Sequence, residues 1–245
     1  MTILVNVKNI KKNYGSKEAV KGISFEIKEN EILGLLGPNG SGKTTTIGMM
    51  LGLLKPSWGE ILIDGKNIEN NRIEILKKIN FISPYIELPK KLTVRQNLIV
   101  YGKLYNVENL NQRLEYLIEK LRLSDLLNRI TGELSSGQKN RIGLAKALIN
   151  DPIVLLLDEP TASLDPEIGD YVRTFLEDYK KEKKISILLA SHNMNEVTRL
   201  CRSILMMKEG VIIDKGNPEE LIKKHGRQNL EEVFLKLSRS NNEYN

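Results

Sequence analysis

Eight consecutive residues of this sequence match the phosphate-binding pattern G-x-x-x-x-G-K-[ST] at every fixed position. They are Gly37, Pro38, Asn39, Gly40, Ser41, Gly42, Lys43 and Thr44, and Thr45 follows them. Glycines allow the backbone to turn so that successive N–H groups point at phosphate oxygens. In such a loop the lysine holds the outer phosphates and the threonine hydroxyl holds Mg²⁺. The stretch therefore predicts a nucleotide-phosphate site, and the alternative is a glycine-rich turn without a ligand.

The residues on either side of this loop favour the phosphate site. Ile32 to Leu36 is an apolar run that predicts a buried strand, and Thr45 to Leu54 predicts a helix. The N-terminus of that helix adds a positive partial charge beside the loop. A strand, a glycine loop and a helix in this order place the loop where a phosphate can be bound.

Two carboxylates follow a second apolar run. Ile153 to Leu157 predicts a central buried strand, and Asp158 and Glu159 fall at its carboxyl end. Ligands of open α/β sheets bind at that edge. Asp158 is suited to hold Mg²⁺ together with Thr44, and Glu159 is suited to polarise the water that attacks a terminal phosphate. The alternative is that the two acids only cap the segment that follows.

A third group of small and polar residues precedes another predicted helix. The group is Leu134-Ser135-Ser136-Gly137-Gln138, and helical spacing continues to about Asn150. Such residues before a helix make a second anion site. A single nucleotide needs only one cradle for its phosphates, so the second cradle is suited to a nucleotide bound to another copy of the chain.

Composition limits the remaining possibilities. The chain has 245 residues, of which 40% are hydrophobic, and the longest apolar runs are far below the ~20 residues that span a bilayer. The first twelve residues lack the apolar stretch of a signal peptide, so we expect a cytosolic protein. The net charge of +6 indicates a solvated surface or, alternatively, an anionic membrane partner, and no nucleic-acid motif is present. The one cysteine, Cys201, lies among apolar residues and is expected to be buried and inert.

Hydrophobic periodicity and turn signals predict a β-rich first third, a helical middle third and an alternating last third. A capping box at Thr93 predicts a helix start, and Asn217-Pro218 predicts another that ends near Gly226. A polar, frayed end is expected over residues 238–245. The other predicted strands are Ile3–Ile10, Ile23–Ile27, Ile61–Ile63, Ile185–Leu189 and the hairpin of 203–207 with 211–214; the other predicted helices are Asn111–Leu121 and Leu230–Leu237.

These patterns predict an α/β protein in three parts. A nucleotide-binding α/β core with a β subdomain is expected over residues 1–84 and 151–216. A helical subdomain that carries the third motif is expected over residues 85–150, and a short helical extension over residues 217–245.

With the phosphate loop, the Leu-Ser-Ser-Gly-Gln group and the strand-end Asp-Glu in this order, the chain resembles the ATP-binding cassette (ABC) family over nearly its whole length. The resemblance implies a P-loop NTPase core with a RecA-like parallel sheet and flanking helices, an antiparallel β subdomain and an inserted α-helical subdomain. It implies that Tyr14 stacks on adenine and that His192 contacts the terminal phosphate. It also implies a head-to-tail pair of cassettes, in which Ser135, Gly137 and Gln138 act on the partner's ATP and residues 163–165 cross the interface.

The sequence departs from the family pattern at two positions. The signature usually has glycine where this chain has Ser136, which is tolerated unless the backbone there needs a positive φ. The family also places a glutamine that touches Mg²⁺ near Pro84, and proline supplies no side-chain oxygen. We therefore expect the signature to bind phosphate, and the metal to take water in place of one ligand.

The resemblance predicts an ATP-hydrolysing subunit of a membrane transporter that drives a separate transmembrane permease as a homo- or heterodimer. The tail around residues 221–224 and 230–234 is similar to that of export-type cassettes. The alternatives are a soluble cassette of the cluster-assembly type and a slow-hydrolysing, nucleotide-dependent switch. DNA-repair cassettes carry long coiled coils and translation-factor cassettes carry two ATPase halves, and this sequence has neither feature. The transported cargo is not encoded in these motifs.

Overall fold

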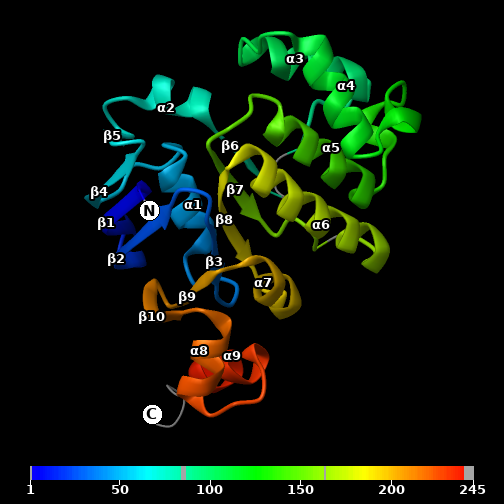
Figure 1. Ribbon diagram of the computed structural model, residues 1–245. Helices are drawn as coiled ribbons and strands as arrows, with labels where there is room; N and C mark the ends of the chain where they lie inside the picture. The colour runs from blue at the N-terminus through cyan, green and yellow to red at the C-terminus, as the bar shows by residue number, and fades with distance from the viewer. Residues whose placement is uncertain (1, 84–86, 163, 240–245) are drawn as a thin grey trace. The chain divides into compact units, whose positions relative to one another are not determined.

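The computed structural model describes residues 2–83, 87–162 and 164–239 of the chain. These residues form two compact units, one from residues 1–75 with 186–245 and one from residues 76–185. Helices and strands alternate along much of the chain (Figure 1). The α/β fold class predicted from the sequence is confirmed.

The first unit contains two groups of strands and the helices that follow them. One group forms an antiparallel sheet in the order β2-β1-β4-β5, and the other contains β10, β9, β3 and β8 as successive neighbours. The elements of this unit are β1 (Ile3–Tyr14), β2 (Lys17–Lys28), β3 (Ile32–Leu36), α1 (Lys43–Met50), β4 (Trp58–Ile63), β5 (Lys66–Asn67), β8 (Ser186–Ser191), α7 (Met194–Leu200), β9 (Ser203–Lys208), β10 (Val211–Gly216), α8 (Pro218–His225) and α9 (Leu230–Arg239).

The antiparallel sheet is built on alternating apolar residues. Val7 of β1 lies opposite Phe25 of β2 and Ile61 of β4, and all three side chains are buried. Strands β1 and β2 are longer than predicted, because the polar residues at their far ends still pair, as between Asn13 and Glu18. Hydrophobic alternation marks only the part of a strand that faces a core.

The parallel strands of this unit are fully buried. All five residues of β3 are buried, and Leu35 lies opposite Ala190 of β8 and Leu205 of β9. Strands buried on both faces have continuous apolar sequences, which is why this run could be recognised. Cys201 is buried beside this sheet, as predicted, and burial raises the pKa of its thiol.

The second unit pairs two parallel strands with a set of helices. Ile79 lies opposite Val154 and Ile82 opposite Leu157. The capping box at Thr93 is confirmed, because its hydroxyl accepts a hydrogen bond from the backbone N–H of Gln96 at 3.2 Å. The elements are β6 (Ile79–Ile82), α3 (Val94–Leu104), α4 (Leu110–Lys120), α5 (Ser136–Leu148), β7 (Val154–Asp158) and α6 (Pro166–Lys183), with 3-10 turns η1 (Ser124–Leu126) and η2 (Thr131–Glu133); α2 (Arg72–Lys78) joins the units in the sequence.

Several predicted boundaries were wrong. The helix after the phosphate loop begins two residues earlier than predicted and ends at Met50, because the chain turns at Leu51 and Gly52 has a φ of +61°. Helix α9 continues to Arg239, so the predicted frayed end starts too early. The His225 side chain is only 14% exposed, although histidine is usually a surface residue, and it bonds to Asp214 at 2.6 Å. The caps of α8 at Asn217 and Gly226 are confirmed.

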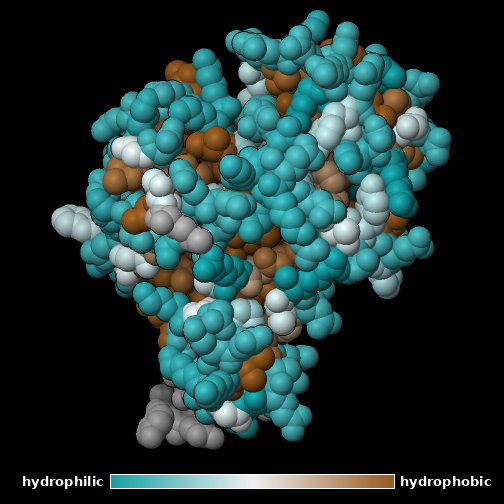
Figure 2. Space-filling view, viewed as in Figure 1, coloured by the Kyte–Doolittle hydropathy of each residue, from teal (hydrophilic) through white to brown (hydrophobic). Residues whose placement is uncertain are grey.

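The hydrophilic character of the surface agrees with the solvated surface that the net charge of +6 indicates. The visible face is mainly hydrophilic, with apolar residues in small groups (Figure 2). Within the described residues, no helix has both the length and the apolar character needed to cross a bilayer.

Candidate functional site

The phosphate loop connects the end of β3 to the start of α1. Its conformation depends on glycine, because Gly40 and Gly42 have φ of +80° and +107°, which side chains rarely allow. A Cβ at Gly42 would lie 2.7 Å from the carbonyl oxygen of Ala19, and a Cβ at Gly37 would collide with the carbonyl oxygen of Met207. The backbone of the loop therefore fits closely between neighbouring strands, and its amides are fixed in position.

Polar side chains of the loop converge on the same place. The Lys43 ammonium donates hydrogen bonds to the carbonyls of Gly37 at 2.7 Å and Pro38 at 3.1 Å, so it lies folded over the loop. The Ser41 hydroxyl is buried and has no hydrogen-bond partner among the described residues. Buried hydroxyls are nearly always bonded, so this donor fits an absent acceptor such as a phosphate oxygen. Thr44 is exposed in the first turn of α1.

His192 follows strand β8 at the edge from which the phosphate loop leaves β3. Leu36 lies opposite Ser191, so Gly37 and His192 each come one residue after paired positions. The His192 side chain is exposed. The residues on either side of His192 are held in place by two contacts. The Ser191 hydroxyl donates to Glu196 at 2.7 Å, and Asn193 caps α7. The structure therefore brings His192 and the phosphate loop together.

Tyr14 is the last residue of β1. It is 47% exposed, and the ammonium of Lys12 lies 5.4 Å from the centre of its ring. An exposed aromatic face of this kind can stack on a base, and the neighbouring cation attracts a negatively charged nucleotide.

The two carboxylates occupy distinct environments at the end of β7 in the second unit. Asp158 is the last residue of the strand and is 3% exposed. Glu159 is partly exposed and has a φ of +52°. This left-handed conformation costs a residue with a side chain about 1–2 kcal/mol. Nine other non-glycine residues among those described also have a positive φ, and at Glu159 this conformation occurs at the residue predicted to activate water.

The Leu-Ser-Ser-Gly-Gln group forms the N-terminus of α5. Ser135 and Gln138 form a reciprocal capping box, in which the Ser135 hydroxyl accepts from the Gln138 backbone N–H at 3.2 Å and the Gln138 side-chain oxygen accepts from the Ser135 backbone N–H at 3.1 Å. Ser136 is the first helical residue and has no positive φ, so glycine is not required there. The exposed Ser135 and Ser136 leave this helix end accessible.

Sequence reasoning missed several residues that support these sites. The Thr46 hydroxyl donates to the carbonyl of Gly42 at 2.9 Å, and Glu196 is buried beside Ser191. A capping signal at Asn193, two residues after strand β8, could have indicated the role of Glu196. Asp165 caps α6, and its side chain accepts a hydrogen bond from the Ile168 N–H at 3.0 Å. Pro84 and Ser163, where a missing glutamine and an interface loop were predicted, lie outside the described residues.

A buried strand, a glycine loop that ends in Lys-Thr and a following helix define the class of P-loop nucleotide-binding proteins. A sequence model of the family described as ABC transporter matches residues 20–162, and this chain belongs to that family.

Curated relatives agree with this assignment. The chain is 38% identical to a Nod factor export ATP-binding protein I of Burkholderia orbicola over 89% of this chain and 72% of that protein. It is 36% identical to the bacitracin transport ATP-binding protein BcrA of Bacillus licheniformis, over 94% of this chain and 75% of that protein. It is 35% identical to the ABC transporter ATP-binding protein NatA of Bacillus subtilis, over 89% of each.

Solved structures show the same fold. The chain is similar to an ATP-binding subunit of an ABC transporter with a TM-score of 0.89 and 25% identity, over 96% of this chain and 99% of that chain. It is also similar to a dimeric ATP-binding cassette in a post-hydrolysis state with ADP and Pi, with a TM-score of 0.81 and 26% identity, over 87% and 98% of the two chains. The chain is therefore an ATPase subunit of an ABC transporter, as the sequence predicted.

Proposed function

We propose that this chain powers export through a separate membrane-spanning permease. The observation that carries the proposal is its similarity to a Nod factor export protein and a bacitracin transport protein over most of both chains. These two relatives are named for chemically unrelated cargoes, so the cassette itself does not select what is transported. Cargo recognition belongs to the permease.

Each predicted site residue has a role in the ATP cycle under this proposal. Residues 37–45 bind the phosphates of ATP, Tyr14 stacks on adenine, and His192 contacts the terminal phosphate. The unpartnered Ser41 hydroxyl and the fixed loop amides support phosphate binding. Glu159 orients and polarises the attacking water.

Thr44 and Asp158 are the residues that would hold Mg²⁺. A hydroxyl and a carboxylate are oxygen ligands of the kind that Mg²⁺ prefers, and Thr44 is exposed in the first turn of α1. A bound Mg²⁺ neutralises charge that develops on the phosphate oxygens during transfer.

The working unit in this proposal is a pair of cassettes. Ser135, Gly137 and Gln138 at the start of α5 act on ATP held by the partner. The exposed helix end supports this role, because the positive N-terminal end of a helix favours an anion. ATP binding closes the pair, and hydrolysis allows the pair to open again. This cycle converts the chemistry of ATP into movement of the permease.

A soluble cassette or a slow nucleotide-dependent switch is the second candidate. The proline at position 84, where the family has a glutamine, favours it. Loss of that side chain would weaken the connection between hydrolysis and a membrane partner.

Affinity purification of the Glu159→Gln variant from gently solubilised membranes, with ATP present, tests the proposal. The variant keeps the shape of the carboxylate but cannot accept a proton, so it should bind ATP, hydrolyse it very slowly and accumulate as dimers. Recovery of a multi-span membrane protein would support the transporter function and identify the permease. The matched control is the parent protein with ADP, in which the dimer should not accumulate. Recovery of soluble partners alone would instead favour the second candidate.

A further inference from the structure

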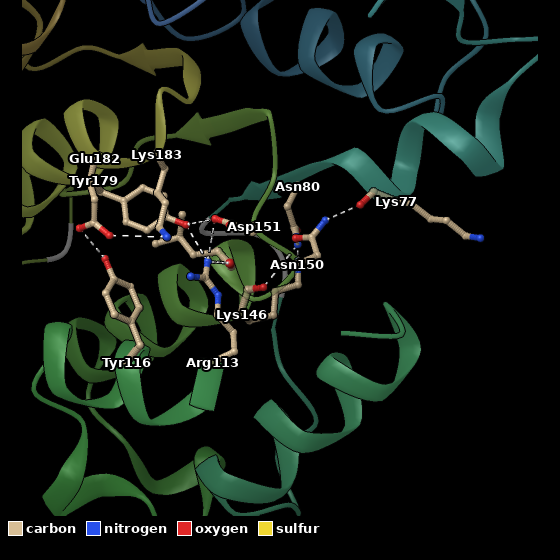
Figure 3. A network of polar contacts seen from close by, with 11 residues as sticks. Lys77, Asn80, Arg113, Tyr116, Lys146, Asn150, Asp151, Tyr179, Glu182 and Lys183 are labelled. Carbon is tan, nitrogen blue, oxygen red and sulfur yellow. Dashed lines mark hydrogen bonds and ion pairs between the residues drawn. The ribbon is translucent and has the colours of Figure 1, made fainter. Parts of the chain in front are cut away.

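A cavity of about 290 Å³ lies within the second unit. It is lined by the carboxyl end of β6, by residues 87–90 and by one face of α5 from Ser136 to Lys146. Its volume is close to the lower limit of pockets that bind small molecules. Lys146 of α5 is one of the residues that line it, and its side chain is drawn beside Asn80 in Figure 3.

The Lys146 amine is buried among uncharged groups. The residue is only 7% exposed. Its Nζ donates to the Asn80 side-chain oxygen at 3.2 Å and to the Phe81 carbonyl at 3.3 Å. The same atom lies 4.6 Å from the centre of the Phe81 ring and 5.5 Å from that of Tyr101 on α3.

No carboxylate among the described residues forms an ion pair with Lys146. Glu87, the acidic residue among those that line the cavity, forms an ion pair with Lys90 at 2.6 Å. Lys139 is the remaining cation of the lining. Because burial disfavours the charged ammonium, the pKa of Lys146 falls to about 8.

We propose that Lys146 is a site of covalent acylation by small acyl phosphates such as acetyl phosphate. The free amine attacks the carbonyl carbon of the acyl group. A nitrogen–carbon bond forms, the bond from that carbon to the phosphate oxygen breaks, and inorganic phosphate leaves. The proton lost from the nitrogen passes to the departing phosphate, which leaves as HPO4²⁻. The product is a neutral N-acyl lysine.

The cavity suits this class of reagent in three ways. Its volume of about 290 Å³ is sufficient for a small acyl phosphate. Lys90 and Lys139 make the lining more positive than negative, which attracts a reagent with a negatively charged phosphate. Lys146 lines the same cavity as Lys90 and Lys139, so the nucleophile and the cations that attract the phosphate share one pocket.

Acylation would alter a hydrogen-bond network that joins β6 to α5. The Asn80 side chain, which accepts from Lys146, also donates to the Asn150 side chain at 2.8 Å, and Asn150 donates to the Lys77 carbonyl at 2.9 Å (Figure 3). Loss of the ammonium removes the charge at one end of this network. The modification would therefore change how the end of β6 is held against α5.

The expected selectivity follows from the amount of free amine. At pH 7.5 a lysine with a pKa of 8 is roughly 24% unprotonated, and an ordinary lysine is about 0.1% unprotonated. That ratio of about 200 is reduced about tenfold, because a less basic nucleophile is weaker, with a Brønsted slope of ~0.4. Lys146 should therefore be acylated about 20-fold faster than exposed lysines of the same unit, such as Lys181, whose side chain is 75% exposed.

The experiment is incubation of the full chain with acetyl phosphate, followed by peptide mass spectrometry that measures acetylation at every lysine over time. The expected result is preferential labelling of Lys146 with a pH midpoint near 8. Urea-unfolded protein is the control, and there the preference should disappear. A Lys139→Met variant should slow labelling of Lys146 by acetyl phosphate but not by an uncharged acetylating reagent.

Equal labelling of Lys146 and Lys181 in the folded protein would overturn the proposal. So would a rate at Lys146 that keeps rising above pH 9, because this would show an amine that is still protonated at pH 8. If Lys139→Met has no effect on labelling by acetyl phosphate while Lys146 keeps its preference, attraction of the phosphate by the lining is wrong and the assignment to acyl phosphates fails.

Discussion

Replacement of Ser41 by alanine should weaken nucleotide binding without destabilising the protein. The Ser41 hydroxyl is 2% exposed and has no partner among the described residues. Its removal therefore breaks no hydrogen bond of the nucleotide-free protein. The same hydroxyl is proposed to donate to a phosphate oxygen when ATP binds.

The effects of Ser41→Ala on ATP affinity and on protein stability differ in magnitude and in sign. A hydrogen bond to a charged group contributes about 1.5–3 kcal/mol, so its loss should raise the Kd for ATP by about 10- to 150-fold. An unsatisfied buried hydroxyl carries a desolvation cost, so the free energy of unfolding of Ser41→Ala should be unchanged or higher by about 1 kcal/mol.

The assay combines titration with a fluorescent ATP analogue and urea unfolding without nucleotide. Ser186→Ala is a matched control, because it removes a buried serine hydroxyl from the same unit. That hydroxyl donates to the Lys28 carbonyl at 3.0 Å and accepts from the Asn30 N–H at 3.0 Å. The control should lose about 1–3 kcal/mol of stability and keep its affinity for ATP.

The reasoning fails if Ser41→Ala binds ATP like the parent protein. It also fails if the variant loses as much stability as Ser186→Ala, because Ser41 would then have a structural partner in the absence of nucleotide.

Three further variants test other parts of the structure. Lys43→Ala should abolish ATP hydrolysis, and near-normal turnover would refute the phosphate-loop assignment. Tyr179→Phe should lower the free energy of unfolding in urea by about 1–3 kcal/mol, because the buried Tyr179 hydroxyl accepts from Arg113 at 2.6 Å and donates to Asp151 at 2.8 Å (Figure 3). The control is Tyr171→Phe, which removes one hydrogen bond from a half-buried tyrosine to the Lys120 carbonyl at an exposed site and should lose less stability. Burial raises the pKa of Asp214, but hydrogen bonds from Lys224 and His225 outweigh it and the net pKa is lowered. The carboxylate therefore stabilises the fold above about pH 4 and loses this effect as the pH falls further. Asp214→Asn should be less stable than the parent at pH 6, and a difference that does not narrow towards pH 3 would contradict this sign.

Local signals explain what could be predicted from the sequence. The phosphate loop, the capping boxes at Thr93 and Asn217, and the buried run of β3 each depend on residues within a few positions of one another. The physical cause of each feature lies in the same short segment, so the sequence pattern of that segment is sufficient to predict its structure.

Long-range contacts explain what could not be predicted. His225 lies next to Asp214 only because the chain reverses after β10, and that brings a hairpin residue to the end of α8. Lys146 is buried because β6, which is more than sixty positions earlier in the sequence, packs against it. A histidine and a lysine are usually exposed, and their surroundings are set by tertiary structure. The short helix α2 was missed because only one of its residues, Ile75, is buried.

The pairing of β3 has a consequence for synthesis of the chain. Its neighbours are β8 and β9, and the first of these begins at Ser186, about 150 residues after β3 ends. At about 5–20 residues per second, a ribosome needs ~8–30 s to make that stretch. During this interval the apolar strand Ile32–Leu36 has emerged without either of its partners. The nascent chain, rather than the folded protein, is therefore the form most exposed to aggregation, and it is the form in which a chaperone would find an apolar segment to bind.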